Sequence, residues 1–171
     1  IEVTGTEAQK VNYYTSFYHT LIQPNQISDI DGMYRNANDE IVKTDGNAFY
    51  STFSLWDTYR AAHPFYTLMV PEKVDDFVTS LVEQGEAQGF LPIWGLWGKE
   101  TYTMIANHGV SVIAEAYRKG FRGFDAERAL NIMKRTQTES HKLKSDRETY
   151  MKYGYFPTDL IRADSVSSTL E

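Results

Sequence analysis

Two segments of the chain place tryptophan next to carboxylate side chains, a combination that suits sugar binding. The first segment contains Trp56 and Asp57, and the second contains Trp94, Trp97 and Glu100. A flat indole ring stacks on the C–H face of a pyranose, while a carboxylate accepts hydrogen bonds from its hydroxyls. All three tryptophans of the chain lie in these two segments. The sequence therefore predicts a carbohydrate pocket to which both segments contribute.

Two further residues are candidates for the same pocket. Arg60 follows Asp57 by three residues, within reach for an ion pair on one helical turn. His108 follows Glu100 by eight residues, close to the same face of a predicted helix, and could hydrogen-bond a ligand. Each assignment has a structural alternative. Asp57 could cap a helix or pair with Arg60, Glu100 could only favour a helix dipole, and His108 could be a packed or rim residue.

Neither catalysis nor metal binding follows from these residues alone. Asp57 and Glu100 could in principle act as acid and base in glycoside hydrolysis, but the linear sequence gives no distance between them. The four histidines show no metal-ligand spacing with one another. The stretch 29–40 is rich in oxygen ligands that calcium accepts, although turn formation explains the same composition and is preferred.

Helical periodicity predicts most of the elements that carry these residues. Apolar residues three and four positions apart predict helices over residues 6–22, 71–89 and 100–119. The helix over 100–119 would bury Met104 and Tyr117, among others. Asp125 should cap the next helix, which carries Leu130 and Met133 as core residues. A further helix is expected over residues 145–153.

The other segments complete a mainly all-α fold of helical hairpins, of the toroid or solenoid kind. Helical signals also begin near Leu55 and are interrupted at Pro64. Residues 30–53 lose the helical period and predict one small β-hairpin or extended loop excursion. Residues 164–171 read as the start of another helix without a C-terminal signal. We therefore expect the chain to be cut from something longer.

The composition excludes several classes of partner and site. With 171 residues the chain suits one domain, and its formal charge of −6 argues against nucleic acid or an anionic membrane surface. The absence of cysteine excludes a disulfide framework, a thiolate metal site and a cysteine nucleophile. No apolar run is long enough to span a bilayer, and any export signal would lie upstream of residue 1 or have been removed.

The chain resembles the bacterial exo-acting α-mannosidases of glycoside hydrolase family 92. The resemblance is carried by residues 50–60, 62–64, 66–68 and 89–94, by Glu100-Thr101 with Met104, and by residues 165–171. It implies that residues 1–171 form part of an (α/α)6 toroid catalytic domain, truncated at the C-terminal end and packed behind a β-sandwich domain in full-length members. Gly95 and Lys99 depart from the family pattern.

The resemblance also implies a mechanism. Asp57 and Trp94 would bind the hydroxyls and ring face of the terminal mannose, with Glu100 beside them. Calcium would act at the catalytic centre of the intact enzyme, which inverts the anomeric configuration. The acid, the base and the calcium ligands are expected beyond Glu171, so this chain would supply a sugar-binding wall and be inactive alone.

The sequence therefore predicts part of a calcium-dependent, inverting exo-α-mannosidase, which acts on α-1,2-linked mannose of glycans in the periplasm or at the cell surface. One alternative is a non-catalytic helical module that binds carbohydrate or protein, and another is an (α/α)6 glycosidase with a different sugar preference. The predicted substrate-binding residues are Trp56, Asp57, Arg60, Trp94, Trp97, Glu100 and His108.

Overall fold

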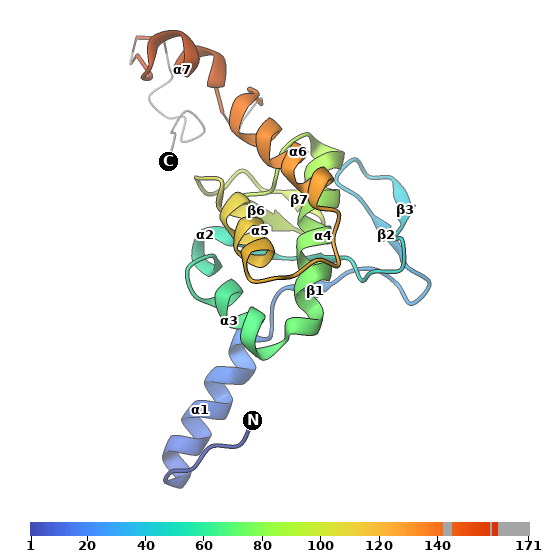
Figure 1. Cartoon of the computed structure of the whole chain (residues 1–171), viewed down its shortest axis with the longest axis vertical. Helices are drawn as coiled ribbons and strands as arrows, with labels where there is room; N and C mark the ends of the chain where they lie inside the picture. Colours follow the sequence, from blue (N-terminus) through green and yellow to red (C-terminus); the bar gives the residue numbers. More distant parts are fainter. Residues whose placement is uncertain (142–144, 158, 161–171) are drawn as a thin grey trace.

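The computed structural model describes residues 1–141, 145–157 and 159–160. These residues form a mainly helical body with three small antiparallel sheets, and helices α1 (Glu7–Thr20) and α7 (Arg147–Tyr153) extend from its opposite ends (Figure 1). The prediction of a mainly helical chain is confirmed. The closed toroid stays a prediction, and the helix expected to start near residue 165 lies outside the described residues.

The helices begin and end where local signals place them. Thr6 caps α1 with a reciprocal capping box, and Pro71 occupies the first turn of α4 (Pro71–Gln88). Gly89 ends α4 in the left-handed region with φ 94°, which a residue without Cβ adopts at no steric cost. Asp125 caps α6 (Ala126–Thr138) by accepting hydrogen bonds from the amides of Glu127 and Arg128. The remaining helices of the described chain are α2 (Leu55–Thr58), α3 (Ala62–Met69) and α5 (His108–Arg118).

The predicted excursion contains a hairpin of β2 (Met33–Arg35) and β3 (Ile41–Lys43). Strand β1 (Asn25–Gln26) pairs with β4 (Tyr50–Ser51). A third sheet joins β5 (Phe53–Ser54), β6 (Trp94–Leu96) and β7 (Lys99–Glu100) in that order. This third sheet was not predicted from the sequence.

The helix predicted over residues 100–119 is therefore wrong in its first two turns. Glu100 lies in β7, and α5 begins only at His108. The cause is a two-residue turn between β6 and β7, in which Trp97 and Gly98 have φ values of 52° and 82°. Two successive left-handed residues make the turn whose twist suits an antiparallel hairpin.

Pro64 was also misread as an interruption. It lies in the first turn of α3, where a backbone amide has no partner within the helix, so a proline costs little there.

Helix α4 is the centre of the core, since α3, α5, α6 and β4 all pack against it. Its stripe of Val74, Phe77, Val78 and Leu81 is buried, as predicted. Other predicted core positions are exposed: Met104 by 38%, Tyr117 by 46% and Leu130 by 47% of their surface, while α1 contains no buried residue. The outer faces of α1, α5 and α6 therefore present apolar side chains to the surroundings.

His63 is a buried histidine on the core side of α3. Its ring lies 6.1 Å from that of Phe53 and 5.5 Å from that of Tyr66, measured between centroids. Burial among these rings lowers the pKa of His63 from 6.5 to about 4, because the imidazolium would lose its hydration. The folded chain therefore holds this side chain neutral at ordinary pH.

We predict that His63 makes the fold sensitive to mild acid. Above pH 6.5 His63 is neutral in both the folded and the unfolded chain. Between pH 6.5 and about pH 4 the unfolded chain protonates this imidazole, whereas the folded chain keeps it neutral. The free energy of unfolding should fall through this window by about 3 kcal/mol. Urea unfolding at pH 7, 6, 5 and 4 should show this fall in the wild type and a flatter profile in His63→Asn. His19→Asn, a change at an exposed histidine, is the control and should keep the wild-type slope. Parallel profiles for wild type and His63→Asn would contradict the prediction.

Candidate functional site

The pairing of β5 with β6 brings the two predicted aromatic segments together. Phe53 lies opposite Gly95, and Ser54 lies opposite Trp94. Directly paired residues of antiparallel strands project to the same face, and successive residues alternate between faces. Phe53 is buried in the core, so Ser54 and Trp94 share the opposite, half-exposed face. The sheet therefore presents Trp94 next to the start of α2.

Asp57 lies beside this face because α2 follows β5 directly. The Ser54 hydroxyl donates a hydrogen bond to Asp57 Oδ2, and the Thr58 hydroxyl donates to the Ser54 carbonyl at 3.0 Å. Asp57 is exposed, and Trp56 next to it keeps 44% of its surface accessible. We call Ser54, Trp56, Asp57 and Trp94 the wall, with Trp56 included as the exposed neighbour of Asp57 in α2. The β5–β6 pairing brings the two segments together, whereas sugar binding by these residues stays a prediction.

Arg60 does not orient Asp57 as predicted. Its Nε donates a hydrogen bond to the Tyr59 hydroxyl at 2.5 Å, and its guanidinium carbon lies 5.1 Å from the centre of the Tyr59 ring. Within the described ranges the partner of the Asp57 carboxylate is Ser54. The reason is the shortness of α2, which ends at Thr58 before Arg60 could complete a helical turn with Asp57.

His108 is joined to the wall through Tyr59 and not through Glu100. The two rings stack with centroids 3.7 Å apart and planes 9° apart. Since Glu100 lies in β7 and His108 begins α5, the shared helical face predicted for them is wrong. The ring stack brings the first residue of α5 against Tyr59, the residue that follows α2.

The Glu100 carboxylate is directed at the backbone. It accepts hydrogen bonds from the amides of Ile93, Trp94, Thr101 and Tyr102 at distances between 2.5 and 3.3 Å. The predicted position at a helix N-terminus is therefore wrong. Because its oxygens already accept these hydrogen bonds, the contacts indicate a structural role for Glu100. Its predicted hydrogen bond to a sugar hydroxyl stays a prediction.

The two departures from the family pattern have structural partners. A Cβ on Gly95 would lie 2.9 Å from both amide atoms of the buried Gln84, so this position has no room for a side chain unless Gln84 moves. Lys99 forms an ion pair of 2.5 Å with Asp39, which also lies 3.5 Å from Arg35. The hydrogen bond from Lys99 lowers the pKa of Asp39. This pair ties the β2–β3 hairpin to the β6–β7 turn.

The oxygen-rich stretch 29–40 forms turns, as preferred from the sequence. Asn36 accepts hydrogen bonds from the amides of Asn38 and Glu40, and Asp31 accepts one from the amide of Met33. Among the residues that the structure describes, no three His, Cys, Asp or Glu side chains gather in a group that could hold a metal ion. The residues present therefore do not fit a calcium site, and calcium has no assigned ligand here.

Several residues near the sheet and α5 have positive φ values. Thr52, Trp97, Tyr102 and Ala106 have φ values of 66°, 52°, 56° and 74°, and each lies within two residues of β5, β6, β7 or α5. Side chains with a Cβ rarely adopt this region, and such residues often cluster at functional sites. Trp97 in the turn is 65% exposed and lies at the rim of the sheet.

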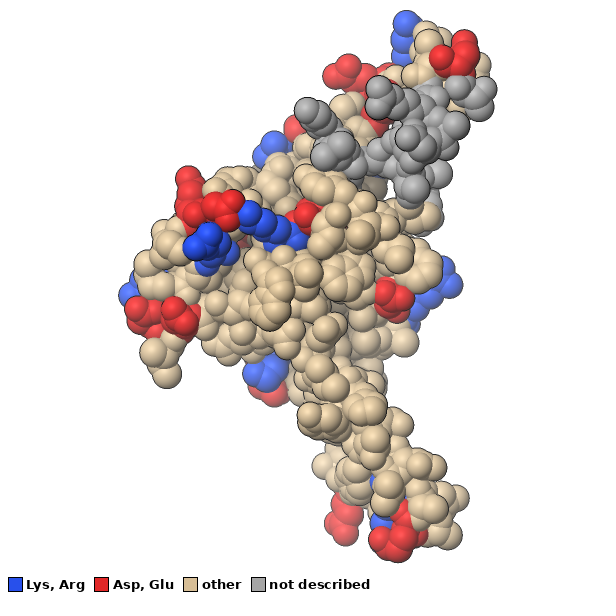
Figure 2. Space-filling model, turned by 180° about the vertical axis from the view of Figure 1, so that it is seen from behind, with Lys and Arg blue, Asp and Glu red and all other residues tan. Residues whose placement is uncertain are grey.

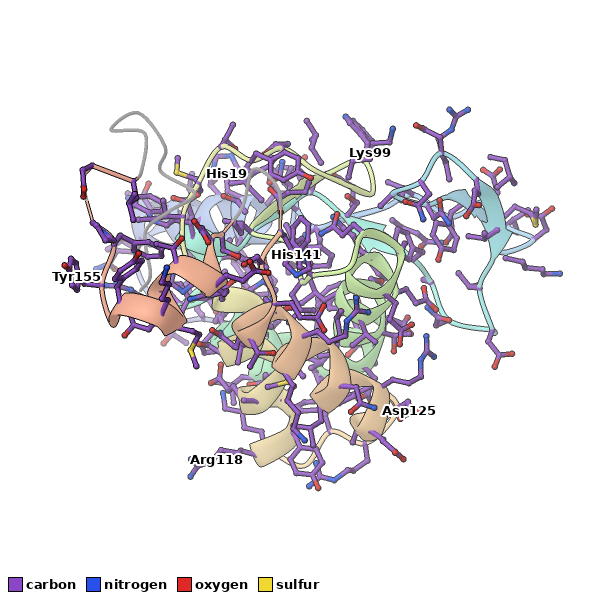
Figure 3. All side chains as sticks on the ribbon, turned by 90° about the horizontal axis from the view of Figure 1, so that it is seen from above. His19, Lys99, Arg118, Asp125, His141 and Tyr155 are labelled. Atoms are coloured by element: carbon purple, nitrogen blue, oxygen red, sulfur yellow. The ribbon has the colours of Figure 1, made fainter. Side chains whose placement is uncertain are left out.

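The sheet and the α5–α6 connection lie on opposite sides of the molecule. Seen from above, Lys99 points away from the side that carries Arg118 at the end of α5 and the cap residue Asp125 (Figure 3). The face that carries the sheet has few charged side chains over its centre, with acidic and basic groups gathered near the hairpin (Figure 2). A surface with few charges over its centre suits a neutral sugar better than a phosphate.

Sequence reasoning missed Ser54 and Tyr59 as parts of the site. A signal for Ser54 was present, because Ser54-Leu55-Trp56-Asp57 has the spacing of a serine and a carboxylate at the start of a helix. The stacking of Tyr59 on His108 left no local signal, since the two residues belong to segments far apart in the sequence.

The solved structures similar to this chain include three of α-mannosidases from Bacteroides thetaiotaomicron. The family GH92 α-mannosidase BT3965 from Bacteroides thetaiotaomicron is 38% identical with a TM-score of 0.85, over 93% of this chain and 22% of that one. The same enzyme in complex with mannoimidazole gives a TM-score of 0.84 and covers 93% and 21% of the two chains at 38% identity. The family GH92 inverting mannosidase BT2199 from Bacteroides thetaiotaomicron VPI-5482 is 28% identical with a TM-score of 0.81, over 94% and 23%.

The remaining comparisons concern curated sequences and protein families. No curated protein gave a match. Within the described residues, no helix has both the length and the apolar character needed to cross a membrane. The family model of the glycosyl hydrolase family 92 catalytic domain matches residues 1–171. Because this match covers the whole sequence and BT3965 shares 38% identity over 93% of it, the chain belongs to glycoside hydrolase family 92 and is part of its catalytic domain.

Proposed function

We propose that this chain supplies the sugar-binding wall of an inverting exo-α-mannosidase, which releases terminal α-1,2-linked mannose from glycans. The observation that carries the proposal is the β5–β6 register, which places Trp94 beside Ser54 and hence beside Asp57. It is supported by the name of one relative as an inverting mannosidase and by the mannoimidazole complex of another. Mannoimidazole is a mannose-shaped ligand, so the pocket of that relative accepts mannose-like molecules.

Each wall residue has a role that its geometry allows. Trp94 and Trp56 would stack on C–H faces of the sugar, where an indole ring offers a large flat apolar surface. Asp57 would accept hydrogen bonds from two mannose hydroxyls, while the hydrogen bond from the Ser54 hydroxyl restrains its carboxylate. Trp97, Arg60 and His108 would lie at the rim, where they contribute shape more than binding energy.

The rest of the catalytic machinery would come from other parts of a longer polypeptide. This chain spans 22% of the length of BT3965. Further helices of an (α/α)6 toroid would cover the apolar residues Tyr117 and Leu130 on the outer faces of α5 and α6. A β-sandwich domain, the general acid and the general base would lie outside residues 1–171. We place the enzyme in the periplasm or at the cell surface, where glycans are accessible.

Calcium belongs to the same proposal. No group of described side chains fits it, so we assign its ligands to other parts of the longer polypeptide. In the family it would help to distort mannose and to position water. The residues of the wall would act beside it by holding the sugar in one orientation.

We predict that Asp57→Ala strongly reduces mannose release without unfolding the enzyme. Removing a charged acceptor that binds substrate hydroxyls should lower kcat/KM for an aryl α-mannoside by roughly 100-fold or more. Kinetics of the longer polypeptide that carries this chain would measure the loss, and circular dichroism would check the fold. Asp45→Ala, at an exposed aspartate in the loop after β3, is the matched control and should keep wild-type turnover. Unchanged turnover in Asp57→Ala would refute the assignment of Asp57.

Binding of mannosides without any release by the wild type would favour a non-catalytic module.

We also predict that chelation with EGTA lowers mannose release and that added calcium restores it. Because the wall does not hold the ion, Asp57→Ala should bind calcium with the wild-type Kd, as measured by calorimetry. Turnover that is unaffected by EGTA would count against a calcium requirement. A Kd raised in Asp57→Ala would contradict the placement of the ligands.

A further inference from the structure

The Glu100 carboxylate binds main-chain donors on both sides of the β6–β7 turn. Its Oε2 accepts from the amide of Ile93 at 2.5 Å and from that of Trp94 at 3.3 Å. Its Oε1 accepts from the amides of Trp94, Thr101 and Tyr102 at 3.2, 2.9 and 2.9 Å. A carboxylate has about four acceptor positions, and four different donors occupy them here. Hydrogen bonds to an ionised acceptor are stronger than those between neutral groups.

The main-chain carbonyl of Trp94 accepts two hydrogen bonds from Thr101, the residue that follows Glu100. The Thr101 amide donates to it at 3.2 Å, and the Thr101 hydroxyl donates to it at 2.9 Å. Both polar main-chain groups of Trp94 are thus bound by the dipeptide Glu100-Thr101. The side chain of Trp94 leaves the backbone between these two anchors. The direction of its Cα–Cβ bond is therefore fixed by contacts that do not involve the indole itself.

The same carboxylate supports a strained residue. Tyr102 has a φ of 56°, which a tyrosine adopts only when its surroundings enforce it. Its amide is one of the four donors to Glu100. The hydrogen bond therefore offsets part of the conformational cost at the point where the chain leaves β7. Loss of the carboxylate would release Tyr102 and the Trp94 amide together.

We propose that Glu100 is a positioning residue that fixes Trp94 for stacking on the sugar, and that it is not itself a ligand of the sugar. The effect on turnover rests on the proposed function. The hydrogen bonds from Glu100 and Thr101 to the main chain of Trp94, which we call the clamp, do not depend on it. Two other roles are disfavoured by position. Glu100 lies in a strand, eight residues before α5, so it serves no helix dipole. Its acceptor positions face amides, so a sugar hydroxyl would have to displace one of them.

A spectroscopic experiment tests the clamp without reference to activity. The longer polypeptide that carries this chain is labelled with 5-fluorotryptophan, and the Trp94 resonance is identified by its loss in Trp94→Phe. Glu100→Gln keeps the size of the side chain but turns a donor group toward backbone donors. It should shift or broaden the Trp94 fluorine resonance. The matched control Glu86→Gln, at a surface glutamate paired with Arg128, should leave that resonance in place. An unchanged Trp94 resonance in folded Glu100→Gln would overturn the proposal.

If Glu100→Gln does not fold, Thr101→Val provides the second test. It removes the hydroxyl bond to the Trp94 carbonyl and leaves the carboxylate intact. The Trp94 resonance should then show a measurable shift, smaller than the shift expected when all hydrogen bonds of the clamp are lost. No movement in Thr101→Val would show that these main-chain contacts do not set the ring position.

A double-mutant cycle separates positioning from direct contact with the sugar. Glu100→Gln should lower kcat/KM for an aryl α-mannoside by roughly 10- to 100-fold, the size of effect expected from a misplaced group. In the Trp94→Phe background the same change should cost about threefold or less, since its effect passes through Trp94. Equal costs in both backgrounds would show that Glu100 acts on the substrate independently. If the wild type releases no mannose, the proposed function fails, and the fluorine result still decides the clamp.

Discussion

The antiparallel pairing of β5 with β6 is the interaction on which the candidate site depends. It involves only two pairs of residues, yet it joins the segment before α2 to the segment after α4. Short strands contribute few hydrogen bonds, so their register needs support from side chains on both faces. On the core face, Phe53 packs edge to face with Phe77 of α4, with ring centroids 6.3 Å apart. On the open face, Ser54 binds Asp57. Glu100, which lies in β7 opposite Gly95, binds the Trp94 amide.

Much of the helical framework could be predicted because its signals are local. Pro71, the periodic apolar residues that follow it and Gly89 define α4 within a single stretch of sequence, and Asp125 defines the start of α6 in the same way. The three-stranded sheet could not be predicted, because its strands are two or three residues long and show no alternation of apolar and polar residues. Its register depends on partners about forty residues apart in the sequence.

The candidate site was predictable in its residue types but not in its contacts. Tryptophan next to aspartate indicated a sugar pocket, and the structure pairs the strand before Trp56 and Asp57 with the strand that carries Trp94. The partners of the charged residues were misassigned, because i and i+3 spacing predicts a contact only within a helix that continues far enough. Arg60 falls beyond the end of α2, and Glu100 falls in a strand. Apolar residues such as Leu130 were expected inside because periodicity identifies a face and does not identify what covers it.

The strength of the ion pair between Lys99 and Asp39 depends on the salt concentration around the protein. Both partners are roughly half exposed, with 45% and 56% of their side-chain surface accessible. Dissolved ions weaken attraction between such charges, and the screening distance shrinks from about 10 Å at 0.1 M to about 3 Å at 1 M ionic strength. At high salt concentration the β2–β3 hairpin would therefore hold the β6–β7 turn, which carries Trp97, less firmly. The β6–β7 turn would then be more mobile than the start of β6, where Glu100 binds the main-chain amides of Ile93 and Trp94.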